Sequence, residues 1–286
     1  MWTQAQLVED LTNLGLREGA SVLAHTSLRA IGKIEGGAET LLNAFLQVLG
    51  PTGTLLVPTF NYDHDDPAQA QNADTSPEDL ERMRSLVPAC DASAPTATAR
   101  WTGVFPDVVR QHREALQSAH PVLSFAAIGA NAAFLTQNAP FHYPLGSSSP
   151  LARLHQLDGY VLLMGVTHTV NASIHLGEVW AEVPYVHRLR RLKTEAEPGA
   201  DEWVTMKGSP ECSEGFAKIE PLLRNCRVLW NGYIGNAASQ LMQQRAVVSM
   251  AIALLQGDSA ALLCNSSSCS YCGIARKFTA EQSMGF

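Results

Sequence analysis

Long apolar runs are absent from this sequence. No window approaches the roughly 18 consecutive apolar residues that a membrane-spanning helix needs. The chain also begins Met1-Trp2-Thr3-Gln4, without the basic stretch and apolar segment of a secretion signal. We therefore expect a protein that has no membrane partner and stays in the cytoplasm.

Positive charge is scarce as well. Lysine and arginine together number 20 against 27 aspartates and glutamates, which gives a formal net charge of -7. A protein that binds nucleic acid usually carries a basic face that neutralises phosphates, and this charge balance offers no sign of one. An acidic surface instead attracts cations. The composition excludes nucleic acid as a partner and favours a small cationic molecule.

Cysteine is sparse, with six residues in 286. In a chain of this length without a secretion signal, we expect reduced thiols rather than a disulfide framework. Cys264, Cys269 and Cys272 do include a Cys-x-x-Cys spacing that suits zinc or an iron–sulfur centre. A tetrahedral site needs a fourth ligand, and none lies near them in the sequence. The prediction is therefore free thiols and no metal.

Apolar residues, in contrast, make up 46% of the chain and can form a large core. A capping box at Thr3 begins an amphipathic helix that Gly15 should end. A strand over 21–25, a helix over 38–49 and a strand over 54–58 then form a βαβ unit. This order predicts an α/β fold around a parallel or mixed sheet.

Helical and strand patterns of apolar residues continue toward the C-terminus. Further helices are expected near 107–112, over 150–157, from about 171, and around 214–223 and 245–255, with strands at 160–166 and near 204. No internal repeat and no clear linker divides the chain. We therefore predict a single domain that spans 1–286.

Residues 61–100 interrupt this pattern. The segment is irregular, and its acids outnumber its arginines. A structureless stretch of this length inside a domain is either a functional lid or partly disordered. We treat 61–100 as an acidic insert or lid.

His175 and Glu178 are the strongest candidates for chemistry. They stand three residues apart where a helix follows a buried strand, so both share one helical face at the edge where α/β folds bind ligands. A carboxylate beside an imidazole orients the ring and stabilises its protonated form. Two other interpretations are open: a structural histidine, or a zinc site with His168, although that spacing matches no standard metal motif.

Two further segments carry polar groups. His25-Thr26-Ser27-Leu28, followed by Gly36-Gly37, places hydroxyls and small residues between a strand and a helix, where they could hold a pyrophosphate or form a plain turn. Ser118 to Phe125 surrounds a proline and could be a binding loop or an ordinary one. A hydrolase would use Ser27 or Ser124 with His120, but neither serine lies in Gly-x-Ser-x-Gly, which argues against it.

Five ordered motifs give a resemblance. They are His-Thr-Ser-Leu-Arg-Ala-Ile-Gly-x-x-Glu-Gly-Gly-Ala from His25, Gly-Pro-x-Gly-Thr-Leu-x-x-Pro-Thr-Phe from Gly50, Ser-x-His-Pro-x-x-Ser from Ser118, Ser-Pro-Leu from Ser149 and Ile-His-Leu-x-Glu from Ile174. Together they resemble the aminoglycoside 3-N-acetyltransferase family, and a looser match continues through Glu211 to Phe216.

The resemblance implies a three-layer α/β/α fold around a mixed, mainly parallel sheet. It also implies direct transfer of an acetyl group from acetyl-CoA to the 3-amino group of a 2-deoxystreptamine aminoglycoside, which confers resistance. His175 would act as general base, with Glu178 orienting it or binding the cationic acceptor. The assembly would be a monomer or homodimer.

The same resemblance implies two sets of binding residues. For acetyl-CoA they are His25, Thr26, Ser27, Leu28, Arg29, Gly36, Gly37, Ser118, His120, Pro121, Ser124, Phe125, Asn171 and Ser173, with backbone N–H groups at 171–173 near the oxyanion. For the acceptor they are Asp63, Asp65, Asp66, His142, Glu178, Glu182 and Glu214.

Two departures from the family pattern keep alternatives open. Ala172 stands where many relatives have threonine, so Ser173 or Thr169 would have to supply that hydroxyl. The acidic insert falls among the loops expected to face the acceptor. The alternatives are an acetyltransferase for another amine and a CoA-binding protein without turnover.

Overall fold

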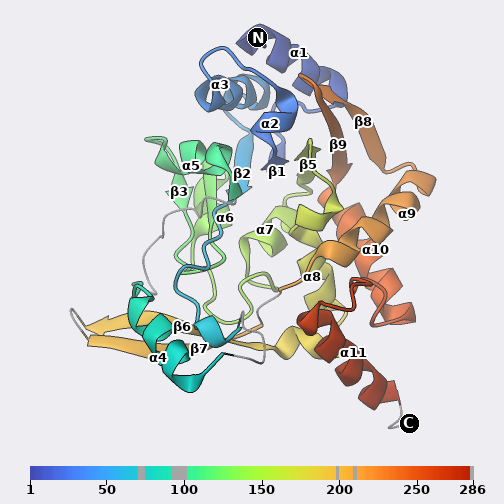
Figure 1. Ribbon diagram of the computed structural model, residues 1–286. Helices are drawn as coiled ribbons and strands as arrows, with labels where there is room; N and C mark the ends of the chain where they lie inside the picture. The colour runs from blue at the N-terminus through green and yellow to red at the C-terminus, as the bar shows by residue number, and fades with distance from the viewer. Residues whose placement is uncertain (70–74, 92–101, 198–199, 209–210, 284–286) are drawn as a thin grey trace.

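A seven-stranded sheet runs through the middle of the molecule (Figure 1). The structure is a computed structural model that describes residues 1–69, 75–91, 102–197, 200–208 and 211–283. In the order of the sheet, the strands are β3 (Leu116–Gln117), β4 (Phe125–Gly129), β2 (Thr54–Pro58), β1 (Ser21–Thr26), β5 (Tyr160–Met164), β9 (Ala237–Gln243) and β8 (Leu229–Ile234).

The sheet is mixed, as predicted. β1 pairs in parallel with β2 and β5, while the pairs β2–β4, β3–β4, β5–β9 and β8–β9 are antiparallel. Most strands share one direction, because only β4 and β9 run against the rest, although four of the six strand pairs are antiparallel. β4 and β9 are each antiparallel to both of their neighbours, and neither strand was predicted from the sequence.

Alternate residues of the strands pack on opposite layers of helices. One face, which includes Val22 and Leu55, packs against α1 (Gln4–Leu14), α3 (Ala38–Leu49) and α5 (Val104–Gln111). The other face, which includes Leu23 and Leu56, packs against α6 (Ala132–Thr136), α7 (Pro150–Gln156), α8 (Ser173–Trp180) and α10 (Gln244–Gly257). This two-residue alternation produces the predicted three-layer α/β/α domain.

Local chemistry explains where several elements begin and end. Thr3 and Gln6 form the predicted capping box, and Gly15 ends α1 with a left-handed φ of 119°. The single helix expected over 214–223 is instead the 3₁₀ turn η5 (Glu214–Ile219) followed by α9 (Glu220–Asn225). Pro221 has no N–H to donate, so a helix cannot continue through it and a new one begins there.

A second, two-stranded sheet stands apart from the main one. It consists of β6 (Leu189–Glu197) and β7 (Ala200–Lys207). The described parts of the insert lie beside this hairpin and include η1 (Pro67–Gln69) and α4 (Pro77–Leu86) (Figure 1). Isolated bridges join Asp65 to Leu192 and Cys90 to Thr194. The lid role of 61–100 stays a prediction, and residues 70–74 and 92–100 lie outside the described part of the chain.

The remaining elements include short turns and the C-terminal helix. They are α2 (Leu28–Ile31), η3 (His168–Val170), η4 (Pro184–His187) and α11 (Ser270–Ser283). The long red helix α11 lies at the lower right of Figure 1, below α8 and α10. Among the described residues, no helix combines the length and the apolar character needed to cross a membrane.

Candidate active site

A cleft of roughly 280 Å³ opens where the parallel strands end. β1 contributes its last residues, β2 leads into the wall, and the chain after β5 returns through η3 into α8. Carboxyl ends of parallel strands meet at one edge of the sheet, which is where α/β folds bind ligands. The lining residues are Ala24, His25, Thr26, Pro58, Phe60, Tyr62, Thr102, Pro106, Val166, Thr169, Val170, Ala172, His175, Glu211 and Ser213.

His175 lines this cleft and is held from behind by a carboxylate. Its Nδ1 lies 2.6 Å from Oε2 of Glu178, which is only 4% exposed. Tyr185 donates its hydroxyl proton to the other carboxylate oxygen, at 3.3 Å. The ring also packs edge-on against Phe216, with centroids 4.7 Å apart. Since Nδ1 is engaged, Nε2 is the ring nitrogen left for a molecule in the cleft.

The first turn of α8 is fixed by polar contacts below the cleft. The side-chain oxygen of Asn171 accepts from the backbone N–H of Ser173 at 3.2 Å, in the manner of a helix cap. The Ser173 hydroxyl in turn accepts from Gln244 at 3.0 Å. Both residues are fully buried and do not line the cleft. Their placement favours support of the His175 helix over the predicted contact with acetyl-CoA, which stays a prediction.

His25 and Thr26 reach the cleft from the end of β1, as the sequence predicts for a binding segment. Nε2 of His25 and the hydroxyl of Thr26 are buried without a hydrogen-bond partner among the described residues. Burial, followed by the nearby charge of His168, lowers the pKa of His25 to about 3. His25 is therefore neutral near pH 7 and offers hydrogen bonding rather than charge to a ligand.

The rest of this predicted segment does not line the cleft. Ser27 caps the short helix α2, where its hydroxyl accepts from Ala30 at 3.3 Å, and α2 also carries Leu28 and Arg29. Gly36 and Gly37 have φ values of 75° and 70°, and Gly37 is the N-cap of α3. A role of these residues in binding the more distant parts of CoA stays a prediction.

The second predicted binding segment is a buried loop before β4. The Ser118 hydroxyl accepts from the N–H of Phe125 at 2.9 Å, and Ser124 donates to the Thr59 carbonyl at 3.0 Å. These serines and Phe125 are fully buried, and Pro121 sits in the turn between them. None of the four lines the cleft. Their contacts favour a structural loop over the binding loop that was the alternative.

His120 organises that loop. Its Nδ1 accepts from the backbone N–H groups of Val122 at 3.1 Å and Leu123 at 2.8 Å, and Nε2 lies 3.2 Å from the Phe141 carbonyl. A neutral ring with its proton on Nε2 satisfies all three contacts. Burial lowers the pKa of His120 to about 4, which keeps the ring in this form.

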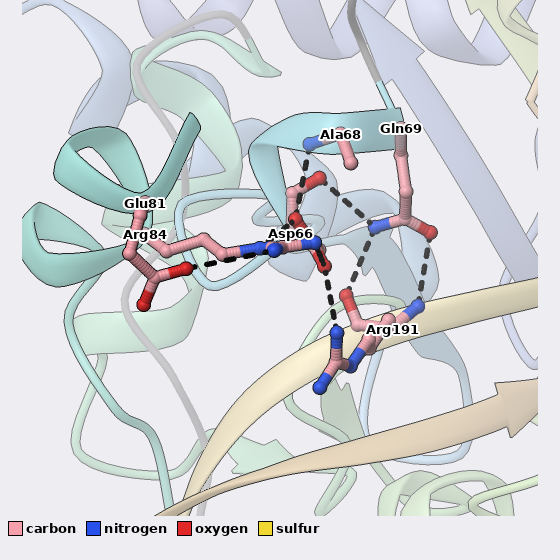
Figure 2. Close-up of polar contacts among 6 residues, drawn as sticks. All are labelled: Asp66, Ala68, Gln69, Glu81, Arg84 and Arg191. Carbon is pink, nitrogen blue, oxygen red and sulfur yellow. Dashed lines mark hydrogen bonds and ion pairs between the residues drawn. The ribbon is translucent and has the colours of Figure 1, made fainter. Parts of the chain in front are cut away.

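Two of the acids predicted to bind the acceptor are already paired with arginines. Asp65 forms an ion pair with Arg190, and burial still raises the pKa of Asp65 to about 6. Asp66 accepts two hydrogen bonds from Arg84, at 3.0 and 2.8 Å, and one from Arg191 at 3.3 Å (Figure 2). Burial opposes the charge on Asp66, but these bonds lower its pKa. Both carboxylates therefore hold the insert against β6.

Of the remaining predicted acceptor residues, Glu178 is buried behind His175, whereas Asp63, His142, Glu182 and Glu214 are exposed. None of the five belongs to the cleft lining. Asp63 follows Tyr62 at the rim, and Glu182 comes just after α8. Their acceptor role stays a prediction, as it does for His142 and Glu214.

Several lining residues were missed by sequence reasoning. Phe60 and Tyr62 form an aromatic wall after β2. Thr169 was not missed, because it is one of the two residues expected to supply the hydroxyl absent at Ala172, and it lines the cleft from within η3. Glu211 lines the cleft and pairs with Arg188 at 3.2 Å, while burial raises its pKa. The loose match of residues 211–216 to the family was the signal that could have revealed Glu211 and Phe216.

Comparison with known proteins finds one matching family. Residues 23–256 match the family model described as aminoglycoside 3-N-acetyltransferase. The aminoglycoside N(3)-acetyltransferase IV of Salmonella sp is 31% identical over 257 residues, which cover 90% of this chain and 88% of that protein. The aminoglycoside N(3)-acetyltransferase VII of Streptomyces paromomycinus is 33% identical over 89% of this chain and 91% of its own.

Solved structures share the fold. The crystal structure of aminoglycoside acetyltransferase AAC(3)-IVa superimposes with a TM-score of 0.81 at 30% identity, and covers 96% of this chain and 97% of its own. A mutant of that enzyme has been solved in complex with a gentamicin. The enzyme AAC-IIIb, which is 26% identical with a TM-score of 0.75, has been solved with CoASH, over 89% of this chain and 96% of its own.

Proposed function

Because this chain belongs to the aminoglycoside 3-N-acetyltransferase family and is therefore an acyltransferase, we propose that it acetylates the 3-amino group of 2-deoxystreptamine aminoglycosides, with acetyl-CoA as donor. The observation that carries this proposal is the contact between His175 and Glu178 at the cleft. The complexes of related enzymes with a gentamicin and with CoASH support the two substrates.

The proposed transfer is direct. Nε2 of His175 removes a proton from the acceptor amine as its nitrogen attacks the thioester carbonyl. The C–N bond forms, the C–S bond breaks, and the proton passes to the departing CoA thiolate. Glu178 stabilises the positive ring while it holds the proton, and it keeps Nδ1 protonated so that Nε2 is the basic nitrogen.

Donors for the developing oxyanion must come from the cleft wall. The N–H of Ser173 already donates to Asn171, so it does not serve this purpose. We assign the role to Thr26, which lines the cleft and whose buried hydroxyl has no hydrogen-bond partner among the described residues. Thr169, which also lines the cleft, takes the place of the threonine that many relatives have at position 172.

The proposed product explains resistance. An aminoglycoside is polycationic, and its binding to RNA depends on charge. Acetylation turns one ammonium group into a neutral amide and so weakens that interaction.

Release of free CoA thiol from acetyl-CoA tests the proposal, with gentamicin-, kanamycin-, neomycin- and apramycin-type acceptors. We expect turnover that depends on the acceptor and falls by roughly 10³-fold in His175→Ala, because general-base catalysis contributes about 10²- to 10⁴-fold. The control is His112→Ala, at the end of α5 and outside the cleft lining. Full turnover in His175→Ala would exclude His175 as the base.

A second candidate is an acetyltransferase for an amine that carries fewer charges. The observation that favours it is the pairing of Asp65 and Asp66 with arginines, which leaves less uncompensated negative charge for a polycation. An amine panel in which every aminoglycoside stays unmodified while another amine is acetylated would establish this alternative. Tight acetyl-CoA binding without thiol release for any amine would indicate a binding protein instead.

A further inference from the structure

Four cysteines from two distant parts of the chain converge behind the cleft. Cys212 precedes η5, Cys264 follows α10, and Cys269 and Cys272 lie at the start of α11. All four Sγ atoms lie within 4.8 Å of one another, and all four are free thiols. The prediction of no metal rested on a missing fourth ligand. That premise is wrong, because the fold brings Cys212 to the other three.

We propose that Cys212, Cys264, Cys269 and Cys272 bind one structural Zn²⁺ ion. Four thiolates around zinc at about 2.3 Å from the metal lie roughly 3.8 Å apart, which is compatible with the observed spacing. An iron–sulfur cluster fits less well, because its cysteines bind different irons and stand farther apart. The Cys-x-x-Cys spacing of Cys269 and Cys272 is common in zinc sites.

Backbone and charged groups around the cysteines suit a zinc–thiolate centre. The N–H of Cys272 points to Sγ of Cys269 at 3.5 Å, and that of Cys264 points to Sγ of Cys272 at 3.4 Å. Zinc with four thiolates carries a net negative charge, and such N–H donors stabilise it. Two cations flank the site: Arg276 donates to the carbonyls of Cys264 and Cys272, and Lys218 donates to the carbonyl of Leu263 at 2.6 Å.

The burial of the site indicates a structural rather than a catalytic metal. Cys264 and Cys272 are buried, and Cys212 and Cys269 are partly buried. Four cysteine ligands complete a tetrahedral shell and leave no open position for substrate. The ion would therefore stabilise the fold without taking part in acetyl transfer.

The proposed site would tie the C-terminal segment to one wall of the cleft. Cys212 lies between Glu211 and Ser213, which both line the cleft. Gly215 is pressed so closely on the C-terminal segment that an added Cβ would lie 2.2 Å from the Leu262 carbonyl oxygen. The next residue, Phe216, packs against His175. Zinc binding would thus fix the segment that supports the catalytic ring.

A second connection runs through α11. Tyr271, next to Cys272, packs edge-on against Tyr185 with ring centroids 6.4 Å apart. Tyr185 donates to Glu178, which holds His175. Loss of the metal should therefore lower the melting temperature first and disturb the cleft second.

The test is the metal content of the full-length protein, produced in zinc-supplemented medium, purified without chelators and analysed by elemental mass spectrometry. We expect about one zinc per chain in wild type and background levels in Cys212→Ser and Cys269→Ser. Cys90→Ser and Cys226→Ser are matched controls, because both thiols lie outside the cluster, and they should keep the zinc. Removal of zinc should lower Tm by roughly 5 to 10 °C.

Wild-type protein also allows a test that does not depend on the folding of variants. After removal of the metal under reducing conditions, added Co²⁺ should produce the visible absorption of tetrahedral cobalt–thiolate, and one equivalent of Zn²⁺ should abolish it. Failure of the reduced protein to take up either metal would overturn the proposal. Stoichiometric iron in place of zinc would overturn the choice of metal. These readouts do not require turnover, so they separate this proposal from the proposed acetyltransferase activity.

Discussion

His175 and His120 differ in how many of their ring nitrogens the protein uses. His120 is 0% exposed, accepts two backbone N–H bonds on Nδ1 and contacts the Phe141 carbonyl through Nε2. His175 uses Nδ1 for Glu178 and faces the cleft. Both lie in motifs that resemble the family. The difference shows that a histidine in a conspicuous motif can be a base or an internal support, according to its partners.

The largest change in activity within this comparison is expected from Glu178→Gln. A neutral amide cannot stabilise a positively charged His175 ring, and it can also select the wrong tautomer. We expect kcat to fall by roughly 10²- to 10³-fold, within the range of general-base contributions. Thiol release with saturating acetyl-CoA and acceptor measures this effect, and circular dichroism checks the fold.

The matched control for Glu178→Gln is Glu114→Gln, an exposed acid outside the cleft lining. Its kcat should equal that of wild type. If Glu178→Gln retained wild-type kcat with an intact fold, His175 would act without its carboxylate, and the contrast with His120 would lose its basis.

His120→Asn should change the pH dependence of stability. The pKa of His120 is about 4 in the folded protein, against the ordinary histidine value of 6.5 that the unfolded chain should have. Between these pH values the unfolded chain binds more protons at His120 than the folded protein does. The contribution of His120 to the free energy of unfolding is therefore fully present above pH 6.5 and is lost as the pH falls toward 4. At pH 5 this loss amounts to about 2 kcal/mol. Urea unfolding at about pH 7.5 and pH 5 measures how much the free energy of unfolding falls between these pH values. This fall should be smaller in His120→Asn than in wild type by that amount.

Comparison of wild type with His120→Asn at each pH removes the contributions of other titrating groups that both proteins share. Asp65 is one of these, because its raised pKa acts in the opposite direction. The exposed His142→Asn variant should keep the wild-type difference. An unchanged pH dependence in His120→Asn would mean that His120 is not a buried neutral support.

Sequence reasoning succeeded where the signal was local. The capping box at Thr3, the βαβ unit and the three-residue spacing of His175 and Glu178 all lie within short windows. It failed where partners come from distant segments. One local signal was also overlooked: Gly235-Asn236, between β8 and β9, is a two-residue hairpin turn that the sequence could have revealed. The approach of Cys212 to the C-terminal cysteines accompanies the close packing of η5 on the segment Leu262 to Cys264, and no local pattern encodes it.

His120 shows a different limit. The motif around Ser118 resembles the family, but the same residue types suit a ligand-binding loop and a loop that is held by its own hydrogen bonds. Only the three-dimensional contacts show that the donors and acceptors there are used internally. The same holds for Asp66, whose acidic character suggested a cationic acceptor and whose actual partners are Arg84 and Arg191.

Tyr185→Phe should give the smallest effect on activity. Its hydroxyl donates to Glu178 at 3.3 Å, at the far end of the connection that begins at His175. A hydrogen bond of this kind contributes about 1 kcal/mol, so we expect kcat to fall roughly 3- to 10-fold with KM nearly unchanged. Tyr233→Phe, which alters a tyrosine that is 67% exposed, is the control. A loss as large as that of Glu178→Gln would show that Tyr185 is essential for holding the carboxylate. No loss would show that the partner of the carboxylate matters less than the carboxylate itself, and that the contrast between His175 and His120 depends on Glu178 alone.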